Sequence, residues 1–366
     1  MYELADGTGG FVILNTNDLL GGLQRIAQDQ NQYYLLGYVP AVSADGSCHS
    51  LKVKADRGGT EVRARSGYCN VRPNDLLAGN PIEKDLESHA NGEMKGNVTG
   101  SMEAPFFYSA SNMAQVHLAV QIPSSVLKFE KVKGKQHASL NILGIAYKTD
   151  NTIAARFSDT VNLDFDGKKE VEEFEKRPFH YENQFGIASG KYNLKVVFSS
   201  GNESFGKIEQ SLVIEPFGDQ QFSIGSLVLS DSLRRTADAA TDLDSLLLED
   251  RTPLVVQGLE ISPSATNQFK TTDTAAIYTE IYEPLLRKPN PPDVAYELFI
   301  VDTKTNQQKS HAGSKLPKTA NTNPVIPLGL KLPVAQLGSG SYRLELRALD
   351  SAGNSSTMRS TEFVVE

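Results

Sequence analysis

The sequence contains no tryptophan, only two cysteines and no long apolar run, and each scarcity excludes a class of protein. Two cysteines in 366 residues can form at most one disulfide within the chain, so a small disulfide-rich domain is excluded. No window approaches the roughly 18 consecutive apolar residues of a spanning helix, so we expect no membrane span. The residues from Met1 to Gly10 lack both a basic and an apolar segment, so no signal peptide is expected there.

Charge and length narrow the possibilities further. The 36 basic and 44 acidic residues give a net charge of −8, which argues against a nucleic-acid partner. Hydrophobic residues make up 39% of the chain, enough for folded cores rather than disorder. A length of 366 residues predicts two or three compact domains.

The N-terminal residues are typical of a strand followed by a helix. The apolar run Phe11 to Leu14 reads as a buried strand. Asn15 and Thr16 are candidate helix N-caps, and apolar residues at helical spacing from Leu19 predict a helix that ends near Gln30.

A β-hairpin is predicted next, with strands His49 to Ala55 and Glu61 to Tyr68. The Gly58-Gly59 loop favours a primed turn, which sets partners whose residue numbers sum to 117. That register places Cys48 opposite Cys69 at a distance within reach of a disulfide. We therefore predict a bridge and an oxidising compartment, the alternative being two free thiols.

The same register divides the hairpin into two faces. The face expected to be buried carries Leu51, Val53, Ala55, Val62, Ala64 and Tyr68. The other face sets four basic residues against each other in two pairs, Lys52 with Arg65 and Lys54 with Arg63. Facing like charges are unfavourable, so this is either a solvated face with splayed side chains, which we favour, or a surface for an anionic partner.

Several short motifs of this region occur in an order known from one family. They are Leu4 to Gly10, Asn15 to Leu19, Tyr34 to Tyr38, Asp45-Gly46 and Val62 to Tyr68. Together they resemble the C-terminal end of the VWFA-related domain family of secreted bacterial proteins, over residues 1–72. The resemblance implies a von Willebrand factor A fold, a doubly wound α/β sheet, followed by a β extension. It also implies a secreted or cell-envelope location.

One departure from the family removes its metal site. Metal-binding A domains use an Asp-x-Ser-x-Ser loop, and this sequence has none. We therefore predict no cofactor, and any metal site would lie upstream of Met1. The chain is expected to be a fragment or a truncated gene product, with residues 1–32 poorly ordered or packed differently from the family.

The rest of the chain is predicted to be a linker and two antiparallel sandwiches. Residues 73–91 are rich in glycine, proline and asparagine and hold at most a helical turn around Ile82 to Ser88. Beyond them, apolar residues alternate over Val116 to Ile122 and Tyr192 to Phe198, as in half-buried strands. The nearly continuous apolar run Leu140 to Tyr147 predicts a central strand.

An internal repeat sets the domain organisation. Gly190 to Leu194 and Leu212 to Glu215 match Gly340 to Leu344 and Phe363 to Glu366, about 150 residues later. Two copies of one β-sandwich explain this, over residues 92–217 and 218–366. The predicted fold class is mainly β: two tandem antiparallel Ig-like β-sandwiches, preceded by an α/β remnant of a von Willebrand A-type domain with a β-hairpin extension.

No motif in the sequence points to catalysis. The histidines lack metal-site spacing, and Asp164 to Gly167 begins like a calcium loop but lacks its later ligands, so a plain turn is favoured. The lysine-rich segment Phe129 to Gln136, with Lys128 just before it, is interpreted as a solvated strand edge or loop. No phosphate loop or serine-hydrolase elbow occurs, although a triad is recognised by geometry rather than by sequence.

These observations predict a non-enzymatic protein of the envelope or exterior. Its sandwiches would bind a protein or another envelope ligand, or act as spacers behind an A-type domain. The main alternative is a carbohydrate-binding module, which is an analogy at the level of fold. An enzyme with a site built from loops is the least favoured hypothesis.

Overall fold

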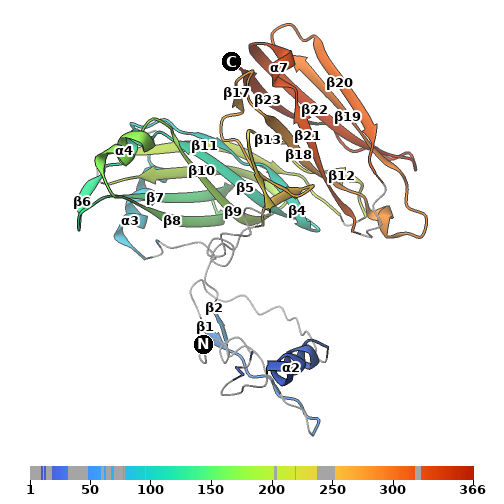
Figure 1. Cartoon of the computed structure of the whole chain (residues 1–366), viewed down its shortest axis with the longest axis horizontal. Helices are drawn as coiled ribbons and strands as arrows, with labels where there is room; N and C mark the ends of the chain where they lie inside the picture. The colour runs from blue at the N-terminus through green and yellow to red at the C-terminus, as the bar shows by residue number, and fades with distance from the viewer. Residues whose placement is uncertain are drawn as a thin grey trace. The chain divides into compact units, whose positions relative to one another are not determined.

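The structure is a computed structural model that describes residues 10, 12–13, 19–31, 48–58, 62, 67–69, 77, 79–94, 96–201, 204–218, 220–236, 252–317 and 323–366. The chain divides into two compact units, Met1–Asp75 and Leu76–Glu366. Strands of antiparallel sheets dominate the described elements, which confirms the mainly β class (Figure 1). No helix in the described ranges is long and apolar enough to cross a membrane.

The first unit contains the predicted helix. Helix α2 (Leu19–Asn31) ends within a residue of the predicted end. Two apolar residues of this helix are exposed, Leu20 by 68% and Leu23 by 54%, so its apolar face is not buried. Of the strand predicted over Phe11 to Leu14, the structure describes Val12 and Ile13, and neither lies in a strand.

The predicted hairpin register is confirmed. Strands β1 (Cys48–Ser50) and β2 (Gly67–Cys69) are antiparallel, and Cys48 is the partner of Cys69. The predicted buried face is wrong at Val53 and Val62, which are 43% and 41% exposed. The physical reason is that each strand pairs over only 3 residues, too few to form a sheet that buries a face.

Sandwich 1, which comprises β3 to β11, has two antiparallel sheets. One has the order β11-β10-β7-β6 with β8 also paired to β7, and the other has the order β3-β5-β4 with β9 also paired to β5. The first sheet contains β6 (Glu130–Val132), β7 (Lys135–Lys148), β8 (Ile153–Phe165), β10 (Gly190–Ser199) and β11 (Phe205–Ile214). The second contains β3 (Ser101–Glu103), β4 (Phe106–Ala110), β5 (Met113–Ile122) and β9 (Phe179–Ala188). Two short helices complete it, η1 (Ser124–Val126) and α4 (Lys168–Phe174).

The alternating patterns predicted for sandwich 1 lie on its core face. Val116 and Val120 of β5 pack with Leu194 and Val196 of β10 in one buried cluster between the two sheets. Strand β7 pairs on both sides, with β8 and β10, so its prediction as a central strand is confirmed.

The outward face of β7 is also partly covered, because helix α3 (Pro81–Asn91) packs on it. Leu86 and Ala90 of α3 form a buried cluster with Leu143 and Ile145 of β7. The helix begins at Pro81. The preceding residue, Asn80, is its N-cap, because the Asn80 side-chain oxygen accepts a hydrogen bond from the Ile82 N–H. The helical turn predicted in the linker is thus an 11-residue helix, and the second compact unit, which begins at Leu76, includes it.

Sandwich 2, which comprises β12 to β23 apart from a small sheet described below, repeats this arrangement, except that β17 and β23 pair in parallel rather than antiparallel as predicted. Its sheets have the orders β12-β18-β13 with β21 also paired to β18, and β17-β23-β22-β19-β20. The first sheet contains β12 (Ser223–Ile224), β13 (Val228–Ser230), β18 (Ala275–Tyr282) and β21 (Val325–Leu332). The second contains β17 (Gln268–Phe269), β19 (Val294–Asp302), β20 (Gln308–Lys315), β22 (Gly340–Asp350) and β23 (Arg359–Val365). Its short helices are η2 (Pro284–Arg287) and α7 (Val334–Leu337).

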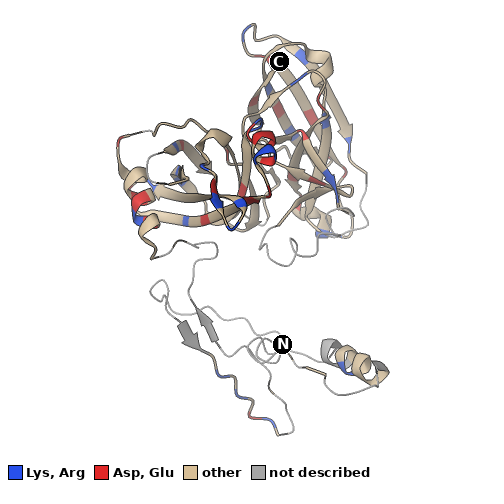
Figure 2. Ribbon diagram, turned by 60° about the vertical axis from the view of Figure 1, so that its left-hand side comes forward, with Lys and Arg blue, Asp and Glu red and all other residues tan. Residues whose placement is uncertain are grey.

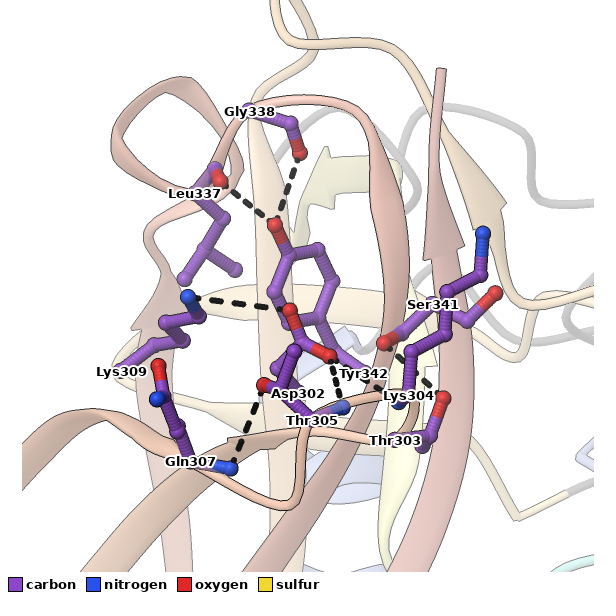
Figure 3. Close-up of polar contacts among 10 residues, drawn as sticks. All are labelled: Asp302, Thr303, Lys304, Thr305, Gln307, Lys309, Leu337, Gly338, Ser341 and Tyr342. Atoms are coloured by element: carbon purple, nitrogen blue, oxygen red, sulfur yellow. Dashed lines mark hydrogen bonds and ion pairs between the residues drawn. The ribbon is translucent and has the colours of Figure 1, made fainter.

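The strand order of sandwich 1 recurs in sandwich 2, and so do two local features. The Tyr192 hydroxyl of β10 donates to the Ala188 carbonyl at 2.8 Å. In the matching strand β22, the Tyr342 hydroxyl lies 2.5 Å from the Leu337 carbonyl and 3.1 Å from that of Gly338, as Figure 3 shows. A tyrosine that bonds back to the backbone just upstream is a feature of Greek-key sandwiches.

The turn between β7 and β8 of sandwich 1 also recurs, between β19 and β20 of sandwich 2. In sandwich 2 the Asp302 carboxylate accepts from the Lys304 and Thr305 N–H groups at 2.9 Å (Figure 3). In sandwich 1 the Asp150 carboxylate accepts from the Thr152 N–H at 2.9 Å. Short polar side chains stabilise such turns by replacing a backbone acceptor.

Candidate functional site

Aromatic side chains join the two sandwiches. The Tyr108 ring of β4 stacks on Phe217 at a centroid distance of 4.3 Å and meets Tyr282 of β18 edge-on at 5.5 Å. The Tyr108 backbone N–H donates to the Tyr282 hydroxyl oxygen at 2.8 Å. Tyr108 and Tyr282 are both buried, so this contact holds the two sandwiches together through side chains that are shielded from solvent.

A carboxylate holds the tyrosines of the junction in place. Glu280 accepts from the Tyr278 hydroxyl at 3.1 Å and from the Tyr282 hydroxyl at 2.7 Å. Burial raises the pKa of Glu280, while these two hydrogen bonds favour its charged form. The Tyr282 oxygen thus donates within sandwich 2 and accepts from sandwich 1.

A small sheet covers the other side of the junction. It consists of β14 (Ser232–Arg235), β16 (Leu259–Ser262) and β15 (Leu254–Val256) in that order. Its buried Ile261 clusters with Phe107 of sandwich 1 and Tyr278 of sandwich 2. Just before β15, the Thr252 N–H donates to Oε1 of Gln184 in sandwich 1 at 2.9 Å. The Gln184 amide N–H donates in return to the Thr252 carbonyl at 3.0 Å.

A polar groove of about 680 Å³ lies between the sandwiches. Its lining includes Gln121, Ser124, Lys176, Arg177, Gln268 and Lys270. Carboxylates of Glu175 and Asp273 also line it, so the groove has no single sign of charge. Figure 2 shows the same mixing of basic and acidic residues over the described strands of both sandwiches.

A second polar region lies on the outward face of β7 and β8, beside the part that α3 covers. Three successive pairs face each other across these strands: His137 with Asp164, Ser139 with Asn162, and Asn141 with Thr160. Each pair shares a side-chain hydrogen bond of 2.8 to 2.9 Å. We call these six residues the polar ladder. A groove of about 440 Å³ beside it is lined by Lys128, Ser139, Asn141 and Ser200, among others.

Two segments noted in the sequence meet at this ladder. The lysine-rich segment forms the β6–β7 hairpin, with Lys133 and Gly134 at positive φ in its turn. The calcium-like segment ends β8, where Asp164 contacts His137 and Asp166 lies 3.2 Å from the Lys135 ammonium. Within the described ranges no three metal-ligating side chains come together. Asp164 and Asp166 each contact a side chain of β7 in this arrangement.

The sequence-predicted site residues lie in the first unit. The backbones of Cys48 and Cys69 are paired, and the bridge between them stays a prediction. Lys52 and Lys54 are exposed, while Arg63 and Arg65 lie outside the described residues, so the basic surface is untested. The polar ladder was not predicted, because its members come from two different strands whose register the sequence did not set, and they match no motif.

The sequence matches no model of a known protein family, and no curated protein is similar to it. Among solved structures, the glycoside hydrolase domain of Endo-D from Streptococcus pneumoniae R6 aligns with 74% of this chain, at 12% identity and a TM-score of 0.16. The chain spans 37% of that structure, and a score this low carries no argument about fold or function.

Proposed function

We propose that the tandem sandwiches form a rigid binding or spacer module in a secreted or cell-envelope bacterial protein, behind a von Willebrand A-type domain. The family resemblance of residues 1–72 supports the location and the neighbouring domain. The partner would be a protein or another envelope component. This role requires no chemistry, and the expectation that the chain is not an enzyme stays a prediction.

The observation that carries the proposal is the buried junction. The rings of Tyr108, Phe217 and Tyr282 contact one another there, and the Tyr108 N–H donates to the Tyr282 hydroxyl. In a freely hinged pair of domains, these side chains and the Tyr108 N–H would be exposed to water. A stiff tandem instead holds a ligand-binding end at a fixed distance from its anchor.

Spin-label distances test the rigidity. Nitroxides would be placed at Lys191→Cys of sandwich 1 and Lys309→Cys of sandwich 2, both exposed positions, in a Cys48→Ser/Cys69→Ser background. A rigid junction predicts a single narrow distance distribution. Its width should match that of a control pair within sandwich 1, Lys131→Cys with Lys191→Cys. A distribution much broader than the control would contradict the proposal.

Carbohydrate binding is the second candidate, and the polar groove between the sandwiches favours it. Amides and hydroxyls such as Gln121, Ser124 and Gln268 line this groove, and such groups can donate to and accept from sugar hydroxyls. The lack of tryptophan weighs against an aromatic sugar platform. A glycan array probed with the full chain decides between the two candidates. Binding that is lost in Gln121→Ala would support the sugar site. An array on which no glycan binds would exclude carbohydrate binding.

A further inference from the structure

Three side chains of the polar ladder lie in the order carboxylate, imidazole and hydroxyl. The Asp164 Oδ1 atom lies 2.9 Å from Nδ1 of His137, and Nε2 of the same ring lies 3.1 Å from Oγ of Ser139. These separations are within the range for a serine nucleophile, its general base and the group that orients the base.

The strand geometry explains why the three meet. His137 and Ser139 are two residues apart on β7, so both point to the same face of the sheet. Asp164 is the direct partner of His137 on β8. Ala138, which lies between His137 and Ser139 on β7, is buried in the core of sandwich 1 and anchors this part of the strand.

The carboxylate selects the histidine tautomer that a general base needs. A carboxylate can only accept, so the Asp164 contact places the proton of neutral His137 on Nδ1. The Nε2 lone pair then points to Ser139. The Asn162 Oδ1 atom, 2.8 Å from the Ser139 oxygen, competes for the same hydroxyl proton.

The adjoining groove supplies room and donors. Asn141 uses its Oδ1 atom to accept from Thr160, which leaves its amide N–H groups for another partner. Asn141 and the cationic Lys128 line the groove together with Ser139. A volume of about 440 Å³ suits a short acyl group, and the two side chains could stabilise an oxyanion next to the serine.

We propose that Ser139 is an activated nucleophile toward small carboxylic esters. Its oxygen attacks the ester carbonyl and forms a C–O bond while its proton moves to Nε2 of His137. The tetrahedral intermediate then breaks its bond to the leaving alkoxide, which takes that proton and departs as an alcohol. Water hydrolyses the acyl-serine in the same way, with His137 as base, and releases the carboxylic acid. This activity goes beyond the proposed binding or spacer role and does not depend on it.

Covalent labelling and turnover by the full chain test the proposal. A fluorophosphonate probe should form an oxygen–phosphorus bond at Ser139 and release fluoride, and peptide mapping should locate the added mass there. Hydrolysis of p-nitrophenyl acetate should fall about 100-fold in Ser139→Ala and in His137→Ala, the usual size of a general-base effect. In Asn162→Ala the competing acceptor is gone, so labelling should become faster.

Matched controls keep the result interpretable. Ser310→Ala changes a serine on β20 that also neighbours a histidine, His311, and should leave labelling and hydrolysis unchanged. Circular dichroism melts would show whether each variant folds, and Ser139→Cys, which retains a nucleophile, should keep reactivity toward p-nitrophenyl acetate. Labelling at other serines, or labelling of Ser139 that is unaffected by His137→Ala in a folded protein, would overturn the proposal.

Discussion

The backbone N–H of Tyr108 in sandwich 1 donates to the hydroxyl oxygen of Tyr282 in sandwich 2, across 2.8 Å. The two residues are 174 positions apart in the chain, and both are buried. The same hydroxyl donates to Glu280 at 2.7 Å, so one oxygen atom joins the first sandwich to a partly buried carboxylate of the second. The junction therefore depends on a polar chain as well as on aromatic packing.

Removing that oxygen should weaken the junction. In Tyr282→Phe the Tyr108 N–H loses its acceptor in a buried site, which costs about 1 to 3 kcal/mol. Denaturant unfolding should show this loss, and hydrogen exchange at the Tyr108 amide should become faster.

The control is Tyr296→Phe on β19, since the Tyr296 hydroxyl bonds to none of the described residues. It should change the free energy of unfolding by less than about 0.5 kcal/mol. Equal effects of the two variants would show that the Tyr108 contact contributes nothing.

Stability should depend on pH through a partly buried carboxyl of β3. Burial raises the pKa of Glu103 to about 7, from 4.5. Between these values the folded state keeps a proton that the unfolded state has lost, so the free energy of unfolding falls as pH rises from about 4.5 to about 7.

Glu103→Gln isolates this contribution, because the amide stays neutral. At pH 8 the variant should be more stable than the parent by up to about 3 kcal/mol, and the difference should vanish near pH 4. Unfolding midpoints across this range measure it. Glu130→Gln, which changes an exposed carboxylate on β6, should leave the pH profile unaltered. A parallel shift for both variants would exclude Glu103 as the source.

Helix α3 should depend on an ion pair with β8. The Arg156 guanidinium bonds to Glu83 and lies 3.4 Å from a carboxylate oxygen of Glu87, and the side chains of Arg156 and Glu83 are 8% and 13% exposed. Arg156→Ala leaves the largely buried Glu83 carboxylate without this cation, which should cost about 3 kcal/mol.

Hydrogen exchange over residues 81–91 and denaturant unfolding would measure the loss. Lys176→Ala breaks an exposed pair with Glu173 and should change stability by less than about 0.5 kcal/mol. If the helix amides stay protected in Arg156→Ala, packing of Leu86 and Ala90 alone holds the helix.

Sequence patterns were sufficient where local rules decide the structure. Alternation predicted the core face of β5, and a Gly-Gly turn predicted the partner of Cys48. Helix α3 was harder to predict, because only Leu86 and Ala90 of its residues are buried and such a pattern is weak. The helix packs on the outward face of β7, where Leu143 and Ile145 are apolar and become buried beneath it. The sequence of the helix alone does not show this contact.

The pairing in the polar ladder could not have been predicted by counting residues outward from the β7–β8 turn. Near the β7–β8 turn, Tyr147 is the partner of Ile153, and a register shift follows between Ala146 and Tyr147. Counting from the turn would set His137 opposite Leu163, whose side chain belongs to the other face of the sheet. The shift moves Asp164 opposite His137, so a single irregular residue creates the ordered array with Ser139.

The last prediction concerns the two cysteines. Their backbones are paired in the predicted register, so we expect a Cys48–Cys69 disulfide in protein made in an oxidising compartment. Peptide mapping without reductant should recover one cross-linked fragment that contains both residues. Closing a loop of about 20 residues should stabilise the first unit by about 3 kcal/mol, so Cys48→Ser should make residues 1–75 more sensitive to protease. The sandwiches should be unaffected, because the second compact unit contains neither cysteine. Two freely alkylated thiols in that same protein would refute the bridge and, with it, one of the two supports for an exported location.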